Sequence, residues 1–220
     1  MKVRGLNAKW VLEGNTQKRT TSLRSGSLWR NFVINKSNIF CCFVDFRKDF
    51  DTVPRNNLWN RLEDLKVPFA LRASIVRLYE NAISKFKRNE GWLKDIKCNI
   101  GVKQGCPLSP TIFGFYINKL EGCLEEAGCA GTILVGIVII LLLYADDSVL
   151  LARCPFILDK KLRILKDFCS TMGMTVNIDK TKIMTIKFKD TYANFVYNNS
   201  NLEEVSSYKY LGIDIHHKLY

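Results

Sequence analysis

The chain has 220 residues, of which 47% are hydrophobic and 25% charged, a balance that fits a globular protein with one sizeable core. Lys and Arg (33) outnumber Asp and Glu (21), and the net charge of +12 favours a polyanionic partner. The 8 cysteines form no Cys-x-x-Cys pair and there are only 2 histidines, so a structural zinc site is not expected. With no signal-peptide pattern, the composition indicates a reduced intracellular protein.

Residues 1–38 are polar and basic and show no regular apolar period, which predicts a poorly ordered N-terminal arm or incomplete lobe before a domain at 39–220. The first apolar strand is expected at 39–46, with Asp45 near its end. Apolar residues at helical spacing over 58–65 and 71–82 then predict two helices, separated at Pro68.

A further helix is expected to begin at Ser109-Pro110, present one apolar face to residue 124 and stop before Gly128. Another spans 158–168 and ends at Gly173, and short strands are expected at 174–178, 182–188 and 208–215. This order of elements predicts an α+β fold, an antiparallel sheet with helices packed on one face.

The run from Ile133 to Leu143 is the most apolar part of the chain, but a membrane-spanning helix needs about 20 residues, so we expect a buried strand here. A polar turn with Asp146 and Asp147 follows, and Val149 begins a return strand. Two adjacent carboxylates at ~4 Å repel by about 4 kcal/mol at an effective dielectric of ~20, a cost that a bound divalent cation reverses. The alternative is an ordinary surface turn, in which Asp is common.

Asp45 offers a third carboxylate, because it too lies at the end of a predicted strand. An isolated Asp in that position is often a cap. Convergence of three carboxylates from neighbouring strands is, however, the requirement of a two-metal phosphoryl-transfer site.

Five segments occur in an order that resembles the successive motifs of a known enzyme family. They are FVDFRKDFDTV, GVKQGCPLSP, YADD, GMTVNIDKTKIM and YKYLG. They resemble the reverse transcriptase domain of LINE-type (non-LTR) retrotransposons, over about residues 39–215. The resemblance implies the palm of a right-hand polymerase with partial fingers and an essentially missing thumb, and the activity of an RNA-directed DNA polymerase that adds dNTPs to a primer 3′-hydroxyl.

The resemblance also implies roles for individual residues. Asp45, Asp146 and Asp147 would hold two Mg²⁺ ions, or Mn²⁺, and Lys180 would protonate the leaving pyrophosphate. Phe46, Phe50, Gln104 and Gly105 would contact the dNTP, with Phe50 excluding a ribose 2′-hydroxyl. Tyr210, Leu211 and Gly212 would grip the primer. The implied partners are an RNA template, a DNA primer and dNTPs, without a membrane, and a nuclear location is compatible with the family.

Several observations leave alternatives open. Phe50 could equally be a core residue, Gln104-Gly105 could form a simple turn, and Asp51 could cap a helix. No basic triphosphate clamp matches within 1–38, and Asp49 stands where the family pattern has a small residue. A truncated, catalytically inactive retrotransposon remnant with the same fold is therefore one alternative. For an active domain, a longer parent protein is expected to supply the missing fingers and thumb. A basic nucleic-acid-binding module is the other.

Overall fold

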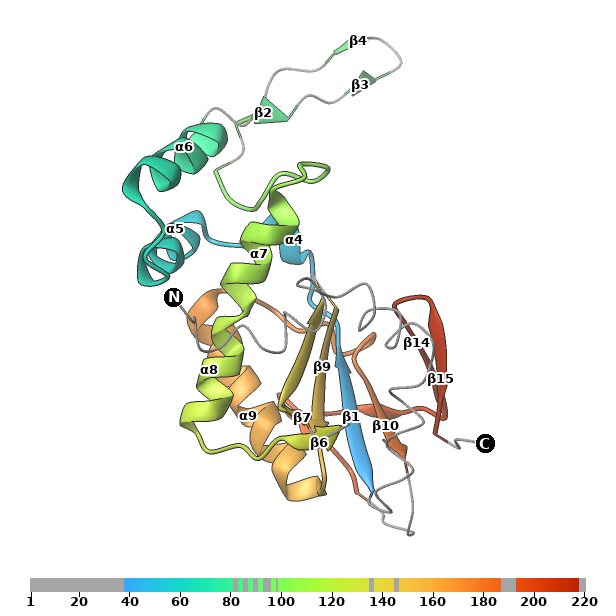
Figure 1. Cartoon of the computed structure of the whole chain (residues 1–220). Coiled ribbons are helices and arrows are strands. Elements are labelled where there is room, and N and C mark those ends of the chain that lie inside the picture. Colours follow the sequence, from blue (N-terminus) through green and yellow to red (C-terminus); the bar gives the residue numbers. More distant parts are fainter. Residues whose placement is uncertain are drawn as a thin grey trace.

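The computed structural model describes most of the chain from residue 38 onward (Figure 1). The described ranges are 38–80, 83–84, 87–88, 91–92, 96–97, 99–134, 137–144, 147–186 and 193–217. The arm predicted at 1–38 lies outside them except for its last residue, and so does Asp146 of the predicted metal site.

Five strands form the central sheet in the order β13-β10-β1-β9-β8. Their bounds are Glu203–Glu204 (β13), Lys182–Ile186 (β10), Ile39–Val44 (β1), Asp147–Ala152 (β9) and Leu141–Tyr144 (β8). The four longer strands are antiparallel to their neighbours, as predicted, whereas the short edge strand β13 runs parallel to β10. Tyr144 pairs with Asp147, which confirms the hairpin expected around the acidic pair.

Helices cover one face of this sheet (Figure 1). They are α7 (Ser109–Ile117), α8 (Lys119–Glu126) and α9 (Pro155–Met172), and the core beneath them includes Phe40, Cys42 and Val44 of β1. The α+β arrangement is therefore confirmed. The helix expected from Ser109 to residue 124 is divided at Asn118, because the Glu121 N–H bonds the carbonyl of Asn118, only three residues back.

A hairpin packs on the opposite face of the sheet (Figure 1). It consists of β14 (Ser207–Tyr210) and β15 (Ile213–His216). Alternate residues of β1 point to this side, so Phe43 meets Tyr208 in a stacked pair with ring centroids 4.0 Å apart. Tyr210 and Ile215 belong to the same buried cluster. The strand predicted at 208–215 is thus a two-stranded hairpin.

A smaller helical lobe adjoins α7 and contains α4 (Asp49–Thr52), α5 (Arg55–Asp64) and α6 (Phe69–Glu80). Leu58 and Leu62 of α5 are buried, as their spacing predicts. The helix predicted over 71–82 is present as α6, but its apolar residues are buried only in part. Ile75 is buried, whereas Leu71 and Leu78 are 54% and 55% exposed. Tyr79 sets the buried side instead, because its ring packs edge-on against Trp59 of α5 at 5.5 Å.

Short strands complete the described fold: β2 (Ile83–Ser84) with β5 (Ile96–Lys97), β3 (Lys87–Arg88) with β4 (Gly91–Trp92), β6 (Thr132–Leu134) with β7 (Ile137–Ile139), and β11 (Val196–Tyr197) with β12 (Ser200–Asn201). The single strand expected at 133–143 is therefore a β6–β7 hairpin followed by β8. The strand expected at 174–178 is only a bridge between Val176 and Phe46. Among the described helices, none is both long and apolar enough to cross a membrane.

Lys161 is the unexpected member of the α9 core face, because its side chain is fully buried beside the predicted leucines. Its Nζ donates to the carbonyl of Leu151 at 2.7 Å and to that of Ile140 at 2.9 Å, which ties α9 to the sheet. Burial lowers the pKa of Lys161 to about 8, since desolvation disfavours the ammonium form.

We expect the replacement Lys161→Met to flatten the dependence of stability on alkaline pH. The unfolded lysine has a pKa near 10.4, so between about pH 8 and 10.4 only the unfolded chain keeps the proton. Stability from this residue is therefore present above the unfolded pKa and is lost as the pH falls through about 8, by up to ~1.4 kcal/mol per pH unit.

Urea unfolding at several pH values between 8 and 10.5 measures this slope. Lys166→Met, at an exposed position of the same helix, is the matched control. Equal slopes in the wild type and in both variants would contradict the assignment to Lys161.

Candidate active site

Asp45 and Asp147 lie at adjacent strand ends. Val44 pairs with Ser148 in the β1–β9 register, so Asp45 is the next residue after β1 and Asp147 opens β9. Strand alternation sends both carboxylates to the sheet face that carries Phe43 and the β14–β15 hairpin. The fold therefore brings together two of the three carboxylates predicted from the sequence, whereas Asp146 lies outside the described residues.

The backbone around Asp45 is held by the segment that follows α9. The Asp45 N–H donates to Thr181 Oγ1 at 3.2 Å, and the Asp45 carbonyl accepts from the Asn177 N–H at 2.8 Å. Arg47 donates its N–H to the Thr175 carbonyl at 2.8 Å. These bonds place the turn that bears Lys180 directly beside the strand end that bears Asp45.

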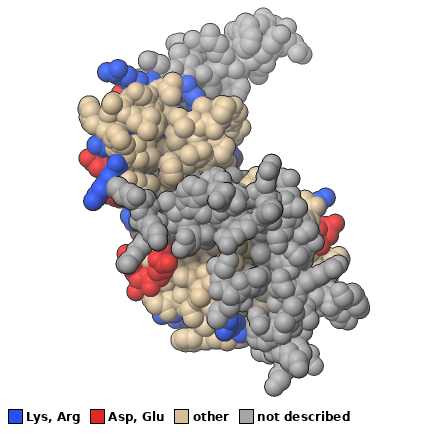
Figure 2. All heavy atoms as spheres, in the orientation of Figure 1, with Lys and Arg blue, Asp and Glu red and all other residues tan. Residues whose placement is uncertain are grey.

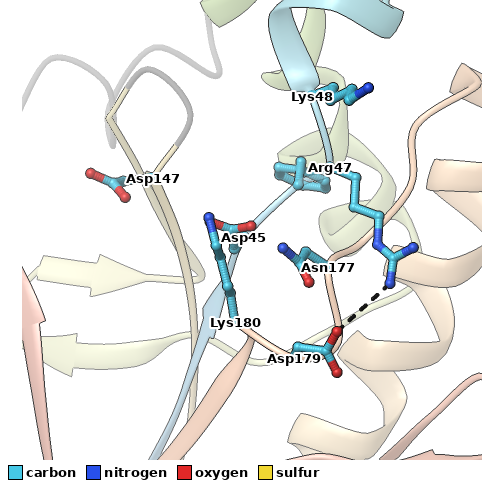
Figure 3. A pocket seen from close by; sticks show the side chains of 8 residues that line it. Asp45, Arg47, Lys48, Asp147, Asn177, Asp179 and Lys180 are labelled. Carbon is cyan, nitrogen blue, oxygen red and sulfur yellow. Dashed lines mark ion pairs between the residues drawn. The ribbon is translucent and has the colours of Figure 1, made fainter.

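An open pocket of about 560 Å³ joins these elements (Figure 3). Its lining combines acidic and basic side chains, and it consists of Asp45, Phe46, Arg47, Lys48, Asp147, Asn177, Asp179 and Lys180. Figure 3 shows Lys180 on the turn next to Asp45, and Arg47 turned toward Asp179 with a 3.9 Å ion pair. Both partners of that pair are more than half exposed, so it adds little to stability.

The tyrosines of the β14–β15 hairpin feel the charge of the two carboxylates. Burial raises the pKa of Tyr208, and the charges of Asp147 and Asp45 raise it further, because a phenolate would be repelled by them. The pKa of Tyr210 is raised by burial and then by Asp147. The Tyr210 hydroxyl is buried without a hydrogen-bond partner in the described part of the chain.

The residues predicted to grip a primer form the tip and inner side of this hairpin. Leu211 and Gly212 connect the two strands, with φ of 50° and 80°, which is the left-handed geometry of a tight two-residue turn. Leucine rarely adopts this conformation. Tyr210 is only 7% exposed, so its ring lies in the core, while Tyr208 is half-buried beside it.

A loop at 101–108 carries Gln104 and Gly105 and lies against α4. Gln104 Nε2 donates to Asp51 Oδ1 at 2.9 Å. Arg55 supports the loop from below, because its Nε donates to the Gly101 carbonyl at 2.9 Å. Phe50, Gln104 and Gly105 do not line the 560 Å³ pocket. They form a second group, joined to it through the short segment from Asp45 to α4.

The likeness to known proteins is consistent with this geometry. The family model described as "Reverse transcriptase (RNA-dependent DNA polymerase)" matches residues 2–215. The chain belongs to the reverse transcriptase family. The match begins well before the first motif and includes most of the basic N-terminal segment.

Curated relatives of this reverse transcriptase domain include the Pol polyproteins of R2 retrotransposons. A Pol polyprotein of a type-1 R2 element from Nasonia vitripennis is 24% identical over 193 residues, which is 80% of this chain and 18% of the relative. The type-2 element R2DM of Drosophila melanogaster is 28% identical over 189 residues, covering 79% of this chain and 17% of the relative. These matches confirm the predicted relationship to LINE-type elements, and the chain spans under a fifth of either relative.

Solved structures of telomerase share the fold. Telomerase from Candida albicans, in complex with a TWJ fragment of telomeric RNA, gives a TM-score of 0.61 at 14% identity, over 92% of this chain and 34% of that one. The Candida tropicalis enzyme with the same kind of RNA fragment gives 0.61 at 17% identity, over 96% and 34%. The right-hand polymerase palm expected from the sequence is therefore the fold of this chain.

Sequence reasoning missed several residues of the site. Arg47, Lys48, Asn177 and Asp179 line the pocket although no role was predicted for them. Their only sequence signal is proximity to Asp45 and Lys180. Asp51 was predicted to be a cap, which is wrong for α4: Lys48 is its N-cap, and Asp51 bonds Gln104 instead.

Proposed function

We propose that this chain is the palm of an RNA-directed DNA polymerase that adds dNTPs to a primer 3′-hydroxyl by two-metal catalysis. The observation that carries the proposal is the placement of Asp45 and Asp147 on adjacent strand ends, in the lining of a pocket that also contains Lys180. RNA-directed DNA polymerase is also the ancestry of the chain, through its family.

The donor set suits magnesium, because two carboxylates offer only hard oxygen ligands and no described cysteine or histidine lines the pocket. Asp45 and Asp147 would hold the ions, and we propose Asp146 as the third carboxylate. Two Mg²⁺ ions, or Mn²⁺, would supply activation of the primer hydroxyl and charge stabilisation of the leaving pyrophosphate.

The remaining side chains would orient the substrates. Lys180 is exposed on the pocket wall, where it would attract the triphosphate and donate a proton to the pyrophosphate. Phe46 also lines the pocket, where it would contact the dNTP. Phe50 would exclude a ribose 2′-hydroxyl, and Gln104 with Gly105 would contact the sugar. Leu211 and Gly212, at the hairpin tip on the carboxylate side of the sheet, would contact the primer, with Tyr208 and Tyr210 behind them.

The proposed macromolecular partners are an RNA template and a DNA primer. A net charge of +12 favours binding of nucleic acid. Figure 2 shows basic side chains along the edge of the lobe formed by α5 and α6, interspersed with acidic ones. Within this lobe Arg72 of α6 forms an ion pair with Glu63 of α5 at 3.1 Å. We propose that the remainder of a longer parent protein completes the template and primer channel.

Primer extension by the purified chain tests this function. A DNA primer annealed to an RNA template is incubated with dNTPs and Mg²⁺ or Mn²⁺, beside an Asp146→Ala, Asp147→Ala double variant and a sample with EDTA. Metal-dependent extension that the double variant loses supports the proposal. A second experiment fuses fingers and thumb segments of a relative to the chain. If the chain binds the RNA–DNA hybrid in a salt-sensitive manner, and neither the chain nor the fusion extends the primer, the inactive remnant is favoured. Equal binding with and without the carboxylates and metal favours the basic binding module.

A further inference from the structure

Among the described residues, the Asp51 side chain makes one hydrogen bond, and its partner is Gln104, which we propose to contact the dNTP. It lies within α4, whose first residue is Asp49 and whose N-cap, Lys48, makes no side-chain capping bond. Its carboxylate accepts a hydrogen bond from Gln104 Nε2 at 2.9 Å across 53 positions of sequence. Asp51 therefore connects the segment after β1 to the loop at 101–108.

The backbones on either side of this contact are fixed to each other. The Val102 N–H donates to the Phe50 carbonyl at 2.6 Å, and the Gly101 N–H donates to the Val53 carbonyl at 2.9 Å. The Phe50 ring stacks on Phe113 of α7 with centroids 5.0 Å apart. Phe50 and the base of the Gln104 loop thus form one rigid unit, in which the long side chain of Gln104 is the part left to be oriented.

The hydrogen-bonding groups of Asp51 and Gln104 determine the orientation of the Gln104 amide. An ionised carboxylate only accepts hydrogen bonds, whereas an amide has a donor end and an acceptor end. Asp51 therefore selects the rotamer of Gln104 in which Nε2 faces the carboxylate, and in a planar amide Oε1 then points away from it. A free amide would present either end to a ligand.

We propose that Asp51 is a positioning residue that orients the Gln104 amide so that Oε1 accepts a hydrogen bond from a sugar hydroxyl of the incoming dNTP. This inference rests on the proposed polymerase function. Because the 2′-carbon of a dNTP bears no hydroxyl, the group recognised through Gln104 is the 3′-hydroxyl. The consequence is a preference for dNTPs over 2′,3′-dideoxynucleotides that depends on a residue outside the metal pocket.

The test compares dTTP with its 2′,3′-dideoxy analogue in single-nucleotide addition to a DNA primer on an RNA template. In Asp51→Ala the Gln104 amide is no longer held, and its hydrogen bond to the 3′-hydroxyl is lost. This loss is expected to raise the KM for dTTP about threefold to tenfold. The KM for the dideoxy analogue and the kcat for both nucleotides should change by less than about twofold, since only a contact to the 3′-hydroxyl is lost. Asp51→Asn, whose amide can turn either its carbonyl or its NH2 group toward Gln104, should restore the preference only in part.

Thr52→Val is the matched control. Thr52 is the next residue of α4, and its Oγ1 donates to the Lys48 carbonyl without touching Gln104. This variant disturbs the same short helix and should leave the dTTP preference unchanged. Urea unfolding of all variants identifies any that fail to fold, in which case Asp51→Asn and Gln104→Leu provide the comparison.

Three outcomes overturn the inference. Unchanged KM for dTTP in Asp51→Ala would remove the role of Asp51, and an equal rise for both nucleotides would show general loosening rather than orientation. A loss of preference in Thr52→Val as large as in Asp51→Ala would assign the effect to α4 itself. If the wild-type chain adds neither nucleotide in the presence of Mg²⁺ or Mn²⁺, the proposed polymerase function fails and this inference fails with it. If the wild type is active and Asp51→Ala still prefers dTTP over its dideoxy analogue to the same degree, only this inference is rejected.

Discussion

Asp45→Asn is expected to reduce primer extension by at least about a thousandfold. Metal ions contribute several kcal/mol to phosphoryl transfer, and a factor of ten in rate corresponds to 1.36 kcal/mol. Asparagine keeps the size of the side chain but removes the charge that would hold a cation. The backbone bonds of Asp45 to Thr181 and Asn177 do not involve the carboxylate, so the variant should fold normally.

Two measurements separate this loss from general damage. Single-turnover extension gives the rate, and electron paramagnetic resonance of Mn²⁺ gives the fraction of bound metal without any turnover. Asp159→Asn is the control, because Asp159 is a surface carboxylate of α9 paired with Arg163, away from the pocket. If Asp45→Asn binds Mn²⁺ like the wild type and extends primers at a similar rate, Asp45 is not a metal ligand.

The parts of the fold that sequence could predict are those with a strong local signal. β1 and the β8–β9 hairpin combine continuous apolar runs with a polar turn, and both formed where expected. α9 has leucines at helical spacing and ends at Gly173, whose φ of 69° is a conformation that glycine adopts more easily than other residues. The resemblance to five ordered motifs then related these elements to one another, which periodicity alone does not do.

The parts that sequence could not predict depend on tertiary contacts. Lys161 is buried in α9 because the carbonyl of Leu151 in β9 and that of Ile140, between β7 and β8, both accept hydrogen bonds from its Nζ, and no local pattern marks them. The buried side of α6 is set by Tyr79, whose hydroxyl bonds Ser109 Oγ at 3.0 Å from a different helix. Asp51 looked like a cap because its partner, Gln104, is far away in sequence. Each of these residues was judged from its own segment, while its partner lay in another.

Gly101→Ala is expected to cause one of the largest losses of stability among single substitutions in this chain. Gly101 has φ of 77°, and a Cβ there would lie 2.6 Å from the Phe50 carbonyl oxygen and 2.7 Å from that of Asp51. The left-handed conformation costs a non-glycine residue about 1–2 kcal/mol, and overpacking adds about 1–3 kcal/mol. We therefore expect the free energy of unfolding to fall by about 2–5 kcal/mol.

Gly105→Ala separates the two causes, because Gly105 has nearly the same φ of 78° but no atom within 4 Å of the added Cβ. It should lose only the conformational part, about 1–2 kcal/mol. Urea unfolding gives both values, provided that the slope with denaturant stays constant. A larger loss in Gly101→Ala means that the 101–108 loop cannot move away from α4 to make room for a Cβ without losing stability. Equal losses would show that the loop moves away from the Phe50 and Asp51 carbonyls without a loss of stability. The inference that Phe50 and the base of the Gln104 loop form one rigid unit would then be wrong.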